Sequence, residues 1–261
     1  MTRPRKSGGD WGRYLAQFHA SHPGITEEIL GEAASEVGSP YQWLVGTLPP
    51  HASVLDVACG SAPLYGKVRP KAWVGIDRSP GELERARSKG ASTLVLGDAS
   101  RLPFPDRSFD AVVCAMAMML FDPLEDCFGE MTRVLSPGGT ITLMVPGGSG
   151  PLYRSDLCRW ARLLAALRVT RLRYPSGRSR KRLAEILQRH DLKVVVDERR
   201  RFSFRVTSAE AADRFVHSLY LPGIQPRRTA AAREVARTWI GEEIGIPLRL
   251  VRARFSRTGE C

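Results

Sequence analysis

Short apolar runs alternate with longer amphipathic segments through the middle of this 261-residue chain. A shorter apolar run ends at Leu96, and four others have the length of buried strands: 53–57, 74–77, 109–114 and 141–145. Strands that alternate with helical segments are typical of a parallel sheet covered by helices on both faces. The pattern therefore predicts an α/β fold across residues 53–145.

The flanking segments extend this pattern on both sides. Helices are expected over 12–20, 26–37 and 40–48, ahead of the first strand. The elements predicted after the alternation are helices over 152–167 and 179–190, a strand over 192–206, helices over 208–219 and 229–244, and a final strand over 248–255. A segment of about forty residues between the last two strands is long for a connection and is expected to be functional.

We expect these elements to form a single domain. Its parts are a disordered tail at 1–10, a helical cap at 11–48, a Rossmann-like core at 52–206 and 246–257, and a helical lid at 207–245. The longest strongly apolar run is too short to span a membrane, and the basic tail lacks the apolar stretch of a signal peptide. A cytoplasmic protein without a membrane partner is expected.

Positive charge is concentrated in the C-terminal half. Residues 151–261 hold 25 basic and 11 acidic residues (25 − 11 = +14), whereas residues 1–150 hold 14 basic and 16 acidic residues. Such asymmetry is compatible with a nucleic-acid or acidic partner. Many of the arginines, such as Arg159 and Arg162, recur at helical-surface spacing, which favours an ordinary solvated surface.

The most specific chemical signal is a turn of small residues after the first predicted strand. Asp56 lies near the end of that strand, Gly60 lies in the turn, and Asp77 ends the next strand about 20 residues later. In an open α/β sheet such a turn lets the backbone approach a nucleoside-containing ligand, and the second acid bonds the ribose hydroxyls. A dinucleotide fingerprint fits poorly, because Ala58 and Pro63 occupy two of its glycine positions.

Further motifs follow in order: Gly97-Asp98-Ala99 after the third strand and Ser136-Pro137-Gly138-Gly139 before the fifth. This series resembles the class I S-adenosylmethionine-dependent methyltransferases, especially the branch that acts on quinones and natural products. The resemblance is strongest over residues 50–146. It implies a seven-stranded Rossmann-like methyltransferase sheet with helices on both faces, and S-adenosylmethionine as the cofactor.

The same resemblance implies a cofactor site built from strand ends. Asp77 would bind both ribose hydroxyls, and Asp56 would hold the turn and the cofactor's amino group. The other implied contacts are Ala58 and Gly60 at the methionine part, Arg78, Asp98 and Ala99 at the adenine, and Ala115 and Met116 near the sulfonium.

Methyl transfer requires alignment and exclusion of water, and it requires a general base only where the acceptor must lose a proton. His19 in the cap and His217 in the predicted lid are candidates for that base, although either could serve only in packing. Tyr14 and Phe18 share one helix face and are expected either to cover the methionine end or to pack the cap on the core. The five cysteines lack metal-ligand spacing, so no metal site is predicted.

These observations predict a methyltransferase that modifies O, N or C of a small, largely apolar or aromatic metabolite, in secondary metabolism, by in-line displacement. Alternate apolar residues at 116–121 are expected either to line the substrate pocket or to fill the core, and Trp11, Phe18 and Trp239 are available from the cap and the lid. Arginines such as Arg214 would bind an acidic group on the substrate. An RNA methyltransferase that uses the basic half stays open, although the chain lacks an Asn-Pro-Pro-Tyr-type motif. A non-methylating, cyclase-like member of the fold also stays open, as does the choice between monomer and homodimer.

Overall fold

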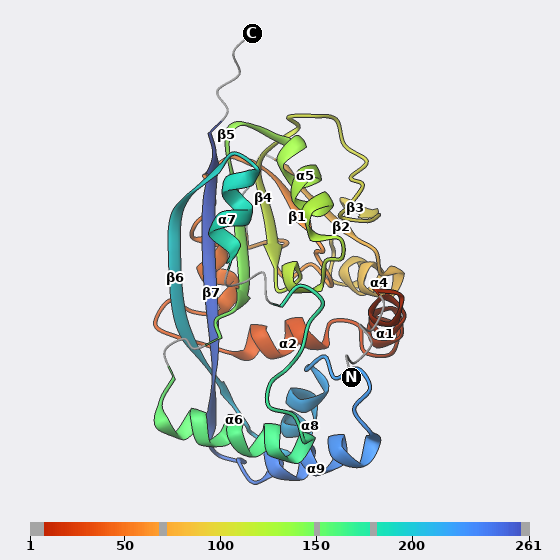
Figure 1. Ribbon diagram of the computed structural model, residues 1–261, viewed down its shortest axis with the longest axis vertical. Coiled ribbons are helices and arrows are strands. Elements are labelled where there is room, and N and C mark those ends of the chain that lie inside the picture. Colours follow the sequence, from red (N-terminus) through yellow and green to blue (C-terminus); the bar gives the residue numbers. More distant parts are fainter. Residues whose placement is uncertain (1–7, 68–71, 149–151, 178–181, 257–261) are drawn as a thin grey trace, which may run out of the picture.

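A seven-stranded sheet forms the centre of the molecule, in the order β3-β2-β1-β4-β5-β7-β6 (Figure 1). This computed structural model describes residues 8–67, 72–148, 152–177 and 182–256. The strands are β1 (Ser53–Val57), β2 (Ala72–Asp77), β3 (Leu94–Leu96), β4 (Phe109–Ala115), β5 (Leu135–Pro146), β6 (Leu192–Arg205) and β7 (Glu243–Phe255). Strands β1 to β5 pair in parallel, and β7 is antiparallel to both β5 and β6. The predicted seven-stranded Rossmann-like sheet is therefore confirmed.

Helices lie on both faces of this sheet. They are α1 (Gly8–Ser21), α2 (Ile25–Glu32), α3 (Pro40–Val45), α4 (Pro80–Ser88), the 3-10 helix η1 (Met118–Leu120), α5 (Leu124–Arg133), α6 (Arg154–Leu167), α7 (Leu183–Arg189), α8 (Ala209–His217) and α9 (Pro226–Arg237). Alternate side chains of β4 enter two separate buried clusters, Val113 in one and Val112 with Cys114 in the other. Because successive strand residues point to opposite faces, the sheet is buried on both sides.

The N-terminal elements differ from the prediction at their ends. Helix α1 begins at Gly8, so residues 8–10 are helical rather than part of a disordered tail, and residues 1–7 lie outside the described residues. Helix α2 ends at Glu32, five residues earlier than predicted. Ala33 is extended, and Ala34 forms an antiparallel bridge with Ser203, so pairing with the sheet takes the place of the last helical turn.

The connection after β1 also departs from the expected alternation of strands and helices. Its described part, residues 58–67, forms turns, with hydrogen bonds such as Tyr65 N–H to the Ala62 carbonyl at 3.1 Å. Ala58, Gly60 and Ala62 all have positive φ. A right-handed helix does not accommodate residues with positive φ, so the described part of this connection is not helical.

Residues 207–245, the segment expected to form a lid, carry the two predicted helices. We call this segment the insertion. Its C-terminal end differs from the prediction. Helix α9 stops at Arg237, and β7 begins at Glu243 because it pairs in register with Arg205 of β6. Figure 1 shows α8 and α9 beside α6 at the bottom of the view, below α2 and α4. Phe215 and Trp239 of the insertion are buried in the main core.

Arginines of the C-terminal half are widely engaged in ion pairs. Their partners are Asp156 for Arg201 at 2.7 Å, Asp213 for Arg237 at 2.7 Å, Asp197 for Arg249 at 2.6 Å and Glu242 for Arg159 at 2.8 Å. These pairs tie part of the positive charge of the C-terminal half to carboxylates of the same chain. No helix in the described part of the chain is both long and apolar enough to cross a membrane.

Candidate functional site

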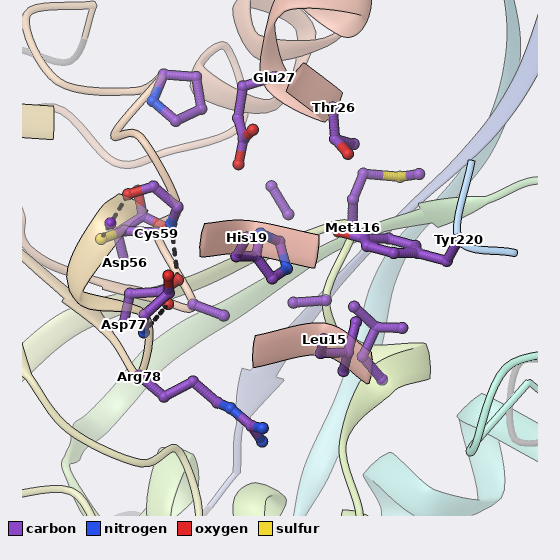
Figure 2. Close-up of a pocket in the computed structure, with 18 of the residues that line it drawn as sticks. Leu15, His19, Thr26, Glu27, Asp56, Cys59, Asp77, Arg78, Met116 and Tyr220 are labelled. Carbon is purple, nitrogen blue, oxygen red and sulfur yellow. Dashed lines mark hydrogen bonds between the residues drawn. The ribbon is translucent and has the colours of Figure 1, made fainter. Parts of the chain in front are cut away.

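A cavity of about 380 Å³ lies at the carboxyl ends of β1, β2 and β4 (Figure 2). Its walls combine strand ends of the core with residues of the cap and one residue of the insertion, Tyr220. Figure 2 shows the carboxylates of Glu27 and Asp77 and the ring of His19 around one common space. The carboxyl edge of an open α/β sheet is where such folds bind their ligands.

Asp77 joins the two turns on this edge. Its Oδ2 accepts a hydrogen bond from the Gly60 N–H at 2.9 Å, and its Oδ1 accepts one from the Ser79 N–H at 2.8 Å. Burial raises the pKa of the Asp77 carboxyl, and the two backbone hydrogen bonds offset part of this effect. Each carboxylate oxygen can accept more than one hydrogen bond, so Asp77 retains acceptor capacity for a pair of ligand hydroxyls.

The backbone around the cavity adopts unusual conformations. Gly60 has φ +53°, and a Cβ at this position would overlap the Glu27 carboxylate, so glycine lets that carboxylate lie directly against the turn. Ala58 and Met116 also line the cavity and have φ of +56° and +58°. Non-glycine residues rarely adopt positive φ, and such strained residues concentrate at functional sites.

Two carboxylates in the cavity wall have unsatisfied oxygens. Asp56 is 1% exposed, and its Oδ2 is buried without a hydrogen-bond partner, as is Oε2 of Glu27, among the residues that the structure describes. Burial and the charge of Asp77 raise the pKa of Asp56 well above its usual range. Burial and the charge of Glu82 raise the pKa of Glu27 to about 7. Unpaired buried acceptors are costly, and they fit a ligand that brings hydrogen-bond donors or positive charge.

A histidine–glutamate pair links the cap to α4. Nδ1 of His19 lies 2.7 Å from Oε1 of Glu82, a 1% exposed carboxylate that also accepts the Gly24 N–H at 3.1 Å. Burial lowers the pKa of His19, but the hydrogen bond and the nearby carboxylates outweigh burial, so the pKa lies above its usual value. His19 is thus held at the cavity wall in a fixed orientation.

The structure brings most of the predicted site residues together. Those that line the cavity are His19, Asp56, Ala58, Gly60, Asp77, Arg78, Ala115 and Met116. The predicted residues outside its lining are Tyr14, Phe18, Asp98, Ala99 and His217. The edge predicted from β1, β2 and β4 is therefore continuous, whereas Asp98 and Ala99 of the loop after β3 are not among the residues that line the cavity.

Tyr14 and Phe18, the aromatic residues predicted from the cap, make packing contacts rather than line the cavity. The Tyr14 hydroxyl accepts the Leu221 N–H at 2.8 Å, and the Phe18 ring lies 4.8 Å from that of Tyr220. Of the two interpretations of this helix face, the structure supports packing of α1, here on the segment that follows α8.

Other predicted positions are engaged elsewhere. Asp98 accepts hydrogen bonds from the Ser100 N–H at 2.8 Å and its hydroxyl at 2.7 Å. His217 lies with its ring 5.6 Å from that of His22, and burial lowers its pKa. Trp239 packs on Phe215, away from the cavity, so its expected place in a substrate pocket is wrong.

The arginine expected to bind an acidic substrate group also lies elsewhere. Arg214 forms an ion pair with Glu32 at 2.6 Å and does not line the cavity. The basic residues of the cavity wall are His19 and Arg78, and the Arg78 guanidinium donates to the Gly12 carbonyl at 3.3 Å. The cavity wall is accordingly acidic on balance.

Sequence reasoning missed Glu27 and Glu82. Each was visible only as an acid in the first turn of a helix, where acids commonly stabilise the helix dipole. Their role depends on α2 and α1 docking against the Gly60 turn and α4, which no local pattern reveals.

Comparison with known proteins identifies the core. Residues 55–143 match the family of the methyltransferase domain. The demethylmenaquinone methyltransferase of Deinococcus radiodurans is 43% identical over 100 residues, covering 35% of this chain and 42% of that protein. The 2-methyl-6-phytyl-1,4-hydroquinone methyltransferase of Synechocystis sp. is 30% identical over 141 residues, covering 51% of this chain and 44% of that protein. In both cases the match spans less than half of the relative's own length.

Solved structures show the same fold. YcgJ of Bacillus subtilis has a TM-score of 0.53 at 19% identity, covering 84% of this chain and 98% of that one. The [4+2]-cyclase SpnF has a TM-score of 0.52 at 19% identity, covering 82% of this chain and 79% of that one. The chain has the fold of these structures, and its residues 55–143 match the methyltransferase domain.

Proposed function

We propose that this protein is an S-adenosylmethionine-dependent methyltransferase that methylates a small, largely apolar molecule of the quinone type. The observation that carries the proposal is Asp77, buried at the carboxyl end of β2 and hydrogen-bonded to the Gly60 turn in the wall of the cavity. The match of the core to a methyltransferase domain supports the reaction class. The quinone-type relatives support the substrate class.

The residues present fit the cofactor. Asp77 would accept the ribose hydroxyls, Gly60 would lie against the methionine part, and the unsatisfied oxygens of Asp56 and Glu27 would face its cationic groups. When bound, S-adenosylmethionine supplies a methyl group activated by its sulfonium. The protein's own task is then to align the acceptor and to exclude water.

The rest of the cavity wall is suited to an apolar acceptor. Its apolar members include residues of α1, of η1 with its neighbours, and of the β1 turn: Leu15, Ala16, Leu64, Met116, Ala117, Leu120 and Phe121. Such a surface excludes water from the reacting atoms, and Met116 provides a flexible contact. A planar, largely apolar ring system fits this environment better than a phosphate-rich nucleic acid.

His19 is the residue that we propose as proton acceptor where the acceptor group ionises. The carboxylate of Glu82 favours the tautomer with the proton on Nδ1, which leaves Nε2 as the nitrogen able to take a proton. Glu82 also stabilises the imidazolium that forms, because the two groups are in direct contact and largely shielded from water.

The proposal is tested with cofactor carrying a tritiated methyl group. The purified protein is offered a reduced quinone, a small-molecule extract and total RNA in separate reactions, with Asp77→Ala as the control. Label in the organic fraction, lost in the control, is expected. Label in RNA would overturn the substrate class.

One specific observation supports a second candidate. SpnF shares this fold and is a cyclase, so the fold alone does not decide between methylation and cyclisation. Cofactor binding without label in any fraction would favour that alternative.

A further inference from the structure

We propose that Glu27 is a cofactor-binding residue supplied by the cap, whose carboxylate pairs with the α-ammonium group at the amino-acid end of S-adenosylmethionine. The inference rests on the proposed function and adds a residue that lies outside the matched domain at 55–143. The cationic end of the cofactor would then contact both the core and helix α2, the second helix of the cap.

The first argument is position. Glu27 lies in the first turn of α2, and its carboxylate lies against Gly60, where a Cβ would overlap it. Gly60 is also the residue whose N–H binds Asp77 at 2.9 Å. A ligand with its ribose on Asp77 and its chain along this turn therefore brings its far end to Glu27.

The second argument is unsatisfied charge. Oε2 of Glu27 and Oδ2 of Asp56 are buried without partners among the described residues, and Asp56 is 1% exposed. The basic residues of the cavity wall are committed elsewhere, Arg78 to the Gly12 carbonyl and His19 to Glu82. The cavity consequently presents carboxylates that a ligand ammonium group would satisfy with charge-assisted hydrogen bonds.

The third argument comes from the neighbouring residue on α2. Glu28 is directed to α4, where it pairs with Arg85. The pKa of Glu27 is raised to about 7 by burial and by the charge of Glu82, so holding its charge is costly until a cation approaches. Of these two adjacent glutamates, Glu28 therefore docks the helix on α4, and Glu27 faces the cavity.

The test is titration calorimetry with two ligands. S-adenosylhomocysteine carries the ammonium group, whereas 5′-methylthioadenosine has the same nucleoside and lacks the amino-acid end. Glu27→Gln is expected to weaken binding of S-adenosylhomocysteine by about 10-fold or more, from the loss of a charge-assisted hydrogen bond. Binding of methylthioadenosine should change by less than about 3-fold, since its contacts lie at Asp77.

The matched control is Glu28→Gln, which should leave the affinities for both ligands unchanged. Asp77→Ala should weaken both ligands, and failure to do so would contradict the proposed function rather than the role of Glu27. Equal weakening of both ligands by Glu27→Gln, or no weakening of either, would overturn the inference.

Hydrogen exchange provides a second readout. In the free Glu27→Gln protein, amides of 25–32 should exchange as in wild type, showing that α2 is still docked. Adding S-adenosylhomocysteine should slow these amides in wild type but not in the variant, whereas methylthioadenosine should slow them in neither. Slowing by both ligands in both proteins would contradict a direct contact between Glu27 and the amino-acid end.

Discussion

The cap at residues 11–48 and the insertion at 207–245 both contribute to the cavity, but what they contribute differs. The cap brings polar groups into the wall, among them His19 and Glu27, whereas the insertion brings one ring, Tyr220. In return, the insertion buries Phe215 and Trp239 in the main core. One segment outside the matched domain therefore builds the site, and the other extends the core over β6 and β7.

The charged groups of the cap and of the insertion also lie in different environments. In the insertion, Asp213 pairs with Arg237 at 2.7 Å near the surface, where such pairs contribute little to stability. In the cap, Glu27 has a buried oxygen without a partner among the described residues, and its pKa is raised to about 7. Perturbed groups in a cavity indicate function, whereas paired groups at a surface indicate ordinary solvation.

The largest difference between the cap and the insertion is expected in turnover, when the histidine of each segment is replaced. His19→Ala should reduce turnover by about 10²- to 10⁴-fold on an acceptor that must lose a proton, because a positioned base is lost. Affinity for S-adenosylhomocysteine should change far less, as calorimetry would show. His217→Ala is the matched control, and a comparable loss of turnover in it would reverse the assignment.

The next effect concerns stability and should come from the insertion. Phe215 is 1% exposed, and its ring stacks on Phe204 of β6 at 5.6 Å. Phe215→Ala should lower the free energy of unfolding by about 3–5 kcal/mol through the cavity that it leaves. Denaturant unfolding measures this loss, and the folded fraction should still bind S-adenosylhomocysteine normally. Unchanged stability would show that the insertion is not part of the core.

The pair between His19 and Glu82 predicts a specific pH dependence. His19 must be neutral to accept a proton, and its pKa lies above the usual value, so turnover should rise with pH through that raised pKa. Glu82→Gln keeps an acceptor for Gly24 but removes the charge, which should move the acidic limb of the profile to lower pH. A profile that keeps its position in the variant would show that His19 does not set it.

The smallest effect is expected at Tyr220. Its ring packs on Phe18 at 4.8 Å, and its hydroxyl is buried. Tyr220→Phe keeps this packing and should change the Michaelis constant for the acceptor by about 10-fold at most, the scale of one neutral hydrogen bond. A far larger change in the Michaelis constant, measured by steady-state kinetics, would show that the insertion contributes strongly to substrate recognition.

The core was predictable because its signals are local. Each buried strand is a short apolar run, and Asp56 and Asp77 lie near the carboxyl ends of neighbouring strands, so their shared edge follows from parallel pairing. The parallel strands, the binding edge at their carboxyl ends and the small-residue turn at Gly60 could all be anticipated.

The remaining features depend on contacts between distant segments. The turn after β1 stays non-helical because Ala58 and Ala62 adopt positive φ, which their residue type does not indicate. Helix α2 ends early because Ala34 pairs with Ser203, far along the chain. Glu27 faces the cavity only because α2 docks on the Gly60 turn, and a sequence pattern cannot distinguish it from its neighbour Glu28.

The central claim is that the cavity binds S-adenosylmethionine through Asp77, and the most direct measurement is calorimetric titration of wild type and Asp77→Ala with S-adenosylhomocysteine. The account predicts one site per chain in wild type and a loss of affinity of about 100-fold in the variant, the scale of two hydrogen bonds to a charged group. Equal affinity in the two proteins would contradict the claim, because the ligand would then bind elsewhere.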